Sequence, residues 1–186
     1  MPPETIDSHI AKMRTHFRYE VEAGNVPLSP GVEDLLRGLQ GRCRIGIATS
    51  SDRETVDYLL GTLTRYADAI VTSDDCSMGK PHPEPYRRAA ERLGLEASDA
   101  LAVEDTPVGI TSARRAGLRV WAVGTSLRTS ELLDAGADYV FAGLPSLATG
   151  LARHQGYELP TEPGDSPRPS DKDGIGSSRH SRTGSR

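Results

Sequence analysis

Between residues 32 and 153, apolar positions follow two patterns that alternate along the chain. Short apolar runs are typical of buried strands, and apolar residues that return every three or four positions are typical of helices. The predicted strands are 44–48, 69–72, 100–103, 119–123 and 139–141, and the predicted helices are 32–39, 52–60, 84–93, 107–116, 130–135 and 146–153. Repeated strand–helix alternation favours an α/β fold, in which a parallel sheet carries helices on both faces.

Start and stop residues support several of these helices. Asp52 is an expected N-cap, because its carboxylate can accept a hydrogen bond from the first turn. Pro107 suits the first position of a helix, where no N–H is needed. Gly94 and Gly117 follow their helices and suit the left-handed backbone that ends them.

The first 24 residues form a separate pattern. Apolar residues follow spacings of four, three, four and four: Ile6, Ile10, Met13, Phe17 and Val21. This stripe predicts an amphipathic helix that ends near Gly24. Its apolar face requires a surface to pack against.

The end of the chain is polar. From Thr161 to Arg186, Ile175 is the only aliphatic residue larger than alanine. Such a segment buries too little apolar surface to offset the entropy of ordering it. We therefore expect residues 156–186 to be a disordered tail, and deletion of 161–186 to leave folding unchanged.

Composition excludes several classes of function. The formal net charge is −4 and the pI is about 5.7, so the chain lacks the basic surface of a nucleic-acid-binding protein. No apolar run approaches the roughly 18 residues of a membrane helix, and no signal peptide opens the sequence. Cys43 and Cys76 form no disulfide framework. These features favour a cytoplasmic protein with neither nucleic acid nor membrane as a partner.

Polar residues that could bind a phosphate or a metal ion follow the predicted strands. In folds of this class, ligands bind beyond the carboxyl ends of the strands. Thr49 and Ser50 end the first strand, and a hydroxyl with free N–H groups there can bind a phosphate, although helix capping is the simpler explanation of these two residues alone. Lys80 lies in a proline-rich loop, either as a fixed cation or as an ordinary surface lysine. Glu104 and Asp105 end the third strand. Such oxygen ligands suit Mg²⁺, and the alternative is that Asp105 caps the next helix.

Taken together, a hydroxyl, a lysine and an acidic pair, in this order at strand ends, resemble one family. The chain resembles the haloacid dehalogenase (HAD) superfamily, in the branch of β-phosphoglucomutase and phosphoglycolate phosphatase. The resemblance covers roughly residues 28–150 and rests on IGIATSSDRE (45–54), GKPHPEPYRRAAERLGL (79–95) and LAVEDTPVGITSARRAGLRVWAV (101–123). It implies a HAD-like Rossmannoid sheet.

The resemblance also implies roles for these residues. In the family an aspartate attacks phosphorus to give an aspartyl-phosphate, a second aspartate acts as acid and base, and Mg²⁺ bridges phosphate and carboxylates. Thr49 and the Ser50 N–H would bind the phosphoryl oxygens, Lys80 would neutralise charge, Asp105 would hold Mg²⁺, and Glu104 would bind it or orient its water. The implied activity is a phosphoric monoester hydrolase for a small phosphorylated metabolite. A β-phosphoglucomutase-like phosphomutase and a non-catalytic phosphate-binding protein are the alternatives.

One family element has no counterpart here. No apolar strand with a D-x-D-G-T-like sequence precedes Thr49, and the similar spelling at 171–175 lies in the polar tail. We therefore expect residues 1–27 to be the remnant of a helical cap, 28–155 a core without its first strand, and 156–186 the tail. That strand would lie between 45–48 and 101–103, so those two strands are expected either to pair or to leave the fold unstable. The resemblance favours an enzyme, while the absent motif leaves open whether this chain catalyses by itself.

Overall fold

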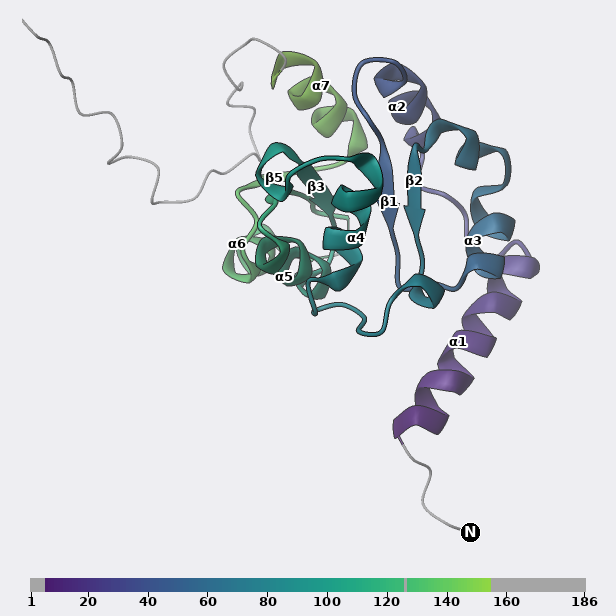
Figure 1. The fold of residues 1–186 in the computed structure, drawn as a ribbon. Coiled ribbons are helices and arrows are strands. Elements are labelled where there is room, and N and C mark those ends of the chain that lie inside the picture. The colour runs from purple at the N-terminus through teal and green to yellow at the C-terminus, as the bar shows by residue number, and fades with distance from the viewer. Residues whose placement is uncertain (1–5, 126, 155–186) are drawn as a thin grey trace, which may run out of the picture.

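The computed structural model describes residues 6–125 and 127–154. Its helices are α1 (Ile6–Glu22), α2 (Val32–Leu39), α3 (Arg53–Leu60), α4 (Glu84–Leu93), α5 (Pro107–Ala116), α6 (Thr129–Ala135) and α7 (Leu144–His154) (Figure 1). Its strands are β1 (Gly46–Ala48), β2 (Ala69–Val71), β3 (Leu101–Glu104), β4 (Arg119–Val123) and β5 (Tyr139–Phe141). The predicted strands and helices are all present in this order, which confirms the α/β class. The predicted tail lies outside the described residues.

The strands are parallel but form two sheets. β1 pairs with β2, and β3, β4 and β5 pair in that order. Within the described residues β1 and β3 do not pair, so the expected closing of these two strands does not occur. Helix α4 contacts both β1 and β2 as well as α5, and Ala48 at the end of β1 packs against the core beside β3 and β4. The two sheets are thus joined through packing and not through backbone hydrogen bonds.

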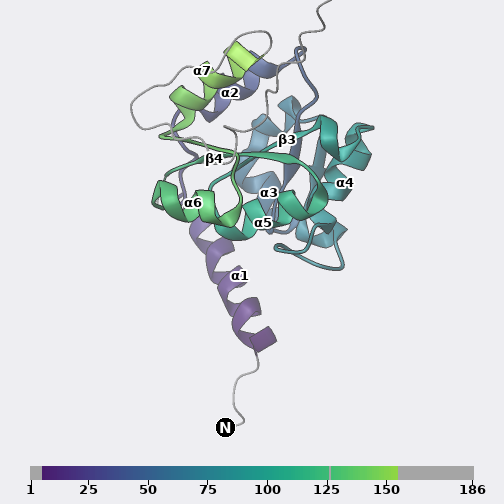
Figure 2. The same cartoon turned by 90° about the vertical axis from the view of Figure 1, so that its left-hand side faces the viewer.

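Helices cover both faces of the larger sheet, as Figure 2 shows. Val120 and Ala122 of β4 are buried in a cluster with Ile110 of α5 and Leu132 of α6. The alternate residues of β4 belong to a second cluster, in which Trp121 packs with residues of β5 and α7. This alternation is the two-residue period of a strand, and burial on both faces explains why β4 is apolar after its exposed first residue, Arg119.

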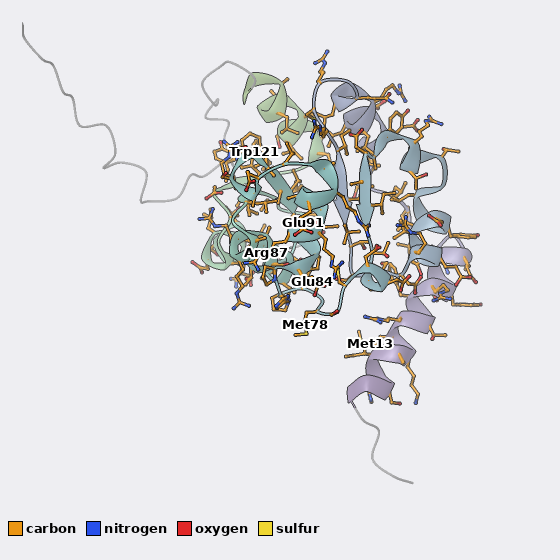
Figure 3. The ribbon with its side chains drawn as sticks, in the orientation of Figure 1. Met13, Met78, Glu84, Arg87, Glu91 and Trp121 are labelled. Atoms are coloured by element: carbon orange, nitrogen blue, oxygen red, sulfur yellow. The ribbon has the colours of Figure 1, made fainter. Side chains whose placement is uncertain are left out.

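Helix α1 extends away from the rest of the fold (Figure 1). Near its end, Arg18 forms an ion pair with Asp52 at 2.7 Å, and Val21 is buried. The middle of the predicted apolar stripe is not covered, because Met13 is 69% exposed and Phe17 41% exposed. Figure 3 labels Met13 on α1. The prediction of a helix is confirmed, whereas its apolar face has only partial cover within the described residues. None of the described helices combines the length and apolar character needed to cross a membrane.

Asp75 gives the fold a dependence on pH. Its carboxylate accepts hydrogen bonds from the N–H and hydroxyl of Thr72 and pairs with Arg92 of α4 at 2.5 Å. These contacts, the Arg92 hydrogen bond first, hold the pKa of Asp75 well below its ordinary value. The carboxylate therefore stabilises the folded state above the ordinary pKa of aspartate, and this stabilisation is lost as the pH falls from there toward the lowered pKa.

We expect Asp75→Asn to lower the free energy of unfolding at pH 7 and to have a smaller effect below about pH 3, where the wild type also loses the contribution. Urea unfolding at both pH values measures this difference. Asp134→Asn, on the exposed side of α6, is the matched control. An equal loss at both pH values would contradict the assignment.

Candidate active site

The centre of the candidate site is the carboxylate of Glu104, at the end of β3. It is buried, with 7% of its side chain exposed, and Lys80 Nζ lies 2.5 Å from its Oε1. The hydroxyl of Tyr86 also donates to Oε1. Thr106 Oγ1 donates to Oε2 at 3.2 Å, and the N–H of Asp105 lies 3.3 Å from the same oxygen. Each carboxylate oxygen thus accepts two hydrogen bonds, as a buried charge requires.

Lys80 is fixed in place by its loop and by Tyr86. The ammonium group lies 4.9 Å from the centre of the Tyr86 ring, and only 13% of the lysine side chain is exposed. Burial, followed by the charge of Glu104, raises the pKa of Tyr86 far above its ordinary value, so its hydroxyl remains a proton donor. The interpretation of Lys80 as an ordinary surface lysine is therefore wrong.

Helix α4 organises the loop that carries Lys80. The carboxylate of Glu84, in its first turn, accepts hydrogen bonds from the N–H groups of Ser77 at 3.1 Å and Met78 at 2.8 Å; Figure 3 labels Glu84 and Met78 at this loop. On the other side, Ser112 Oγ of α5 donates to the carbonyl of His82 at 2.6 Å. The loop is thus held between the first turn of α4 and the middle of α5.

The first turn of α5 packs directly against the carboxylate of Glu104. Thr106 is the N-cap, since its Oγ1 accepts the N–H of Gly109 at 3.1 Å. A Cβ atom on Gly109 would lie 2.0 Å from Glu104 Oε2, so only glycine leaves room for the carboxylate. A negative charge at this position is favoured by the positive end of the helix dipole. The alternative in which Asp105 caps the helix is wrong, because Thr106 fills that position.

Thr49 and Ser50 lie at the end of β1. The Thr49 N–H donates to Val71 O at 2.9 Å, and Thr49 Oγ1 accepts the N–H of Ser51 at 3.1 Å in a local turn. The N-cap of α3 is Asp52, which accepts the N–H of Thr55 at 2.8 Å. The prediction for Asp52 is confirmed, and capping does not account for Thr49. The structure joins Lys80 and Glu104 directly, whereas within the described part of the chain Thr49 makes no hydrogen bond to either of them.

Asp105 and Glu104, the two predicted metal ligands, differ in exposure. Asp105 is exposed at the end of β3, while both oxygens of Glu104 are already engaged by protein donors. The described residues contain no cluster of three or more metal-ligating side chains. Mg²⁺ commonly uses one or two carboxylates together with waters and substrate phosphates. Of the two predicted metal ligands, Asp105 therefore has the carboxylate that could contribute to a Mg²⁺ site, and its role as a ligand stays a prediction.

Sequence reasoning missed Tyr86, Thr106 and Gly109 as parts of this site. Tyr86 looked like one apolar position of an amphipathic helix, and Gly109 had no visible role in its helix. The Thr-Pro pair before α5 was the one available signal, because threonine before such a proline is a strong N-cap.

Comparison with known proteins identifies the family. The model for haloacid dehalogenase-like hydrolases matches residues 2–123, which is more than half of the chain. The chain belongs to the haloacid dehalogenase-like hydrolase family. Its relatives lie in the phosphatase and phosphoglucomutase branch, as the resemblance predicted.

Three relatives show the extent of the similarity. Over 91 residues the chain is 42% identical to validoxylamine A 7'-phosphate phosphatase of Streptomyces hygroscopicus subsp. limoneus, covering 47% of this chain and 43% of that one. The crystal structure of CbbY from Rhodobacter sphaeroides in complex with phosphate has a TM-score of 0.62 and 30% identity, covering 77% of this chain and 65% of that one. A putative β-phosphoglucomutase structure from Thermotoga maritima has a TM-score of 0.60 and 30% identity, covering 67% and 59%. The chain spans about half the length of the first curated relatives it matches.

Proposed function

We propose that this chain forms the phosphate-binding and Mg²⁺-binding part of a HAD-like hydrolase that acts on the phosphoric monoester of a small metabolite. The observation that carries the proposal is Lys80, held at 2.5 Å from buried Glu104 beside exposed Asp105 at the end of β3. A fixed cation next to a free carboxylate suits a phosphate group and its metal. Relatives named as a phosphatase and as a phosphate complex support this substrate class.

Each residue then has a role in positioning and charge stabilisation. Lys80 would neutralise phosphate charge, and Glu104 and Tyr86 would keep its ammonium group in place. Thr49 and the Ser50 N–H would hold phosphoryl oxygens at the end of β1, next to the start of α3. Asp105 would hold Mg²⁺, which supplies charge neutralisation for the phosphate. Phosphoryl transfer gains most of its rate from such positioning and electrostatics.

The nucleophile has no counterpart among the described strand ends. Thr49, Thr72, Asp105, Gly124 and Ala142 follow the five strands, and none of them begins a D-x-D sequence. This observation favours a second candidate function, in which the chain binds phosphate without turning it over. We also propose that any aspartyl-phosphate forms on an aspartate other than Asp105, which is the only aspartate among these five residues.

Phosphate binding tests the proposed function. We expect inorganic phosphate with Mg²⁺ to bind in isothermal titration calorimetry, and Thr49→Val to weaken binding roughly tenfold, since a hydrogen bond to a charged group is lost. Thr64→Val removes a similar hydroxyl, which donates to Gly61 O at 2.8 Å in the short helix after α3, and should leave binding unchanged. Absence of binding by the wild-type chain, or equal loss in both variants, would overturn the proposal.

Turnover tests the position of the nucleophile. With Mg²⁺ and p-nitrophenyl phosphate, we expect this chain to release nitrophenol no faster than buffer. Release that disappears in Asp105→Asn would show instead that the chain supplies its own nucleophile. That result would remove the second candidate function and retain the hydrolase.

A further inference from the structure

Two large apolar side chains beside the candidate active site are exposed. Met78, two residues before Lys80, is 54% exposed, and Val108, in the first turn of α5, is 50% exposed. Figure 3 labels Met78 and Glu84 at the loop that carries Lys80. Single exposed apolar residues are common on protein surfaces. These two, however, belong to the loop and the helix that surround the Lys80–Glu104 ion pair.

Val108 lies on the face of α5 that contacts the loop before α4. On this face, Ser112 Oγ donates to the carbonyl of His82 at 2.6 Å. Val108 precedes Ser112 by four residues, so it lies on the same side of the helix, one turn nearer its beginning. Its neighbour Gly109 packs against the carboxylate of Glu104. Val108 is thus an exposed apolar residue directly beside the end of β3.

Met78 is held at the backbone although its side chain is exposed. Its N–H donates to the carboxylate of Glu84 at 2.8 Å, which fixes the loop against the first turn of α4. Gly79 separates Met78 from Lys80, and a Cβ atom there would meet no atom within 4 Å beyond its chain neighbours. This open space leaves room for a group that is attached to a phosphate at Lys80 and extends toward Met78.

Polar groups near these two side chains already have protein partners. The hydroxyls of Thr106 and Ser112 donate to acceptors of the protein, and the N–H groups of Ser77 and Met78 do the same. A polyol placed here would give up hydrogen bonds to water without gaining replacements from these donors. An apolar group has no such hydrogen bonds to lose.

We propose that Met78 and Val108 contact the organic part of the phosphoric monoester and favour an apolar group over a polyol. The proposal rests on the proposed function, because it requires the phosphate to bind at Lys80. On contact, a group of the size of a phenyl ring and the two side chains leave water together, which favours binding in proportion to the apolar area covered. Methionine suits this role, since its unbranched side chain adapts to the shape of a ligand.

Calorimetric titration of the full chain with Mg²⁺ tests the preference, using phenyl phosphate, glycerol 1-phosphate and inorganic phosphate. We expect phenyl phosphate to bind roughly tenfold more tightly than glycerol 1-phosphate. In the double variant Met78→Gln/Val108→Thr, which replaces apolar by polar atoms with little change of shape, the two esters should bind equally. Met13→Gln changes a 69% exposed methionine on α1 and should keep the tenfold ratio.

The outcomes distinguish this proposal from the proposed function. Equal affinities of the two esters for a wild-type chain that binds inorganic phosphate would overturn the preference alone. A tenfold ratio that persists in the double variant would also overturn it, because other residues would then contact the organic group. If inorganic phosphate does not bind to the wild-type chain, the proposed function fails and the preference fails with it.

Discussion

We expect Lys80→Met to destabilise this protein by about 3–5 kcal/mol, because it leaves the charge of Glu104 buried without its partner. The Glu104 side chain is 7% exposed, and the hydroxyls of Tyr86 and Thr106 are neutral donors that cannot replace a cation. Such a loss is a large fraction of the stability of a typical domain. Urea unfolding of the two proteins at pH 7 measures the difference.

A second substitution, at Glu104, distinguishes the loss of the ion pair from the loss of side-chain packing at Lys80. The double variant Lys80→Met/Glu104→Gln removes both charges of the pair. It should recover part of the stability that Lys80→Met alone loses, because no buried charge remains. Lys12→Met, on the exposed side of α1, should change stability by about 0.5 kcal/mol or less. A Lys80→Met protein as stable as the wild type would show that solvent reaches Glu104 and that the pair does not hold Lys80 in place.

Gly109→Ala is expected to be nearly as damaging, at about 3 kcal/mol. Its methyl group would lie 2.0 Å from one Glu104 oxygen and 2.1 Å from the carboxyl carbon. The carboxylate has to move, and it then loses the geometry in which it meets Lys80, Tyr86 and Thr106. Phosphate binding should weaken along with stability, since Lys80 loses its fixed position. Calorimetric titration and urea unfolding of the same sample measure both effects.

Gly38→Ala is the matched control for this variant. Gly38 also lies in a helix, α2, and a Cβ there meets no atom within 4 Å. Alanine has the higher helix propensity, so this change should stabilise the protein by up to about 1 kcal/mol. Equal effects of the two substitutions would show that helix propensity, and not the position of Glu104, decides the outcome at Gly109.

Local signals predicted much of this fold because they act within a few residues. Asp52 caps α3 through the N–H of Thr55, and Gly94 and Gly117 end their helices with positive φ. The apolar period placed β3, β4 and β5 to within one residue. These features depend on backbone geometry and on neighbouring positions, which a single sequence displays directly. The family followed from the order of Thr49, Lys80 and Glu104-Asp105, since motif order is also a property of the sequence.

The arrangement of the site needed the tertiary structure. Lys80 and Glu104 are 24 residues apart. No local pattern indicates that a lysine in a loop pairs with this carboxylate, because an exposed lysine in contact with water would show the same sequence. Tyr86 and Gly109 belong to different helices, and their roles exist only because α4 and α5 converge on the end of β3. The strands β1 and β3 were likewise expected either to pair or to leave the fold unstable. Instead, packing of α4 against β1, β2 and α5 joins β1 to the rest of the fold without pairing it to β3.

By itself, therefore, the sequence determined the order of strands and helices, the helix ends, and the residue types available at the strand ends. The tertiary structure decided which of these residues meet, which carboxylate is buried and which remains exposed at Asp105. The physical reason is that capping and periodicity are local, while burial and charge pairing depend on contacts between segments distant in the chain.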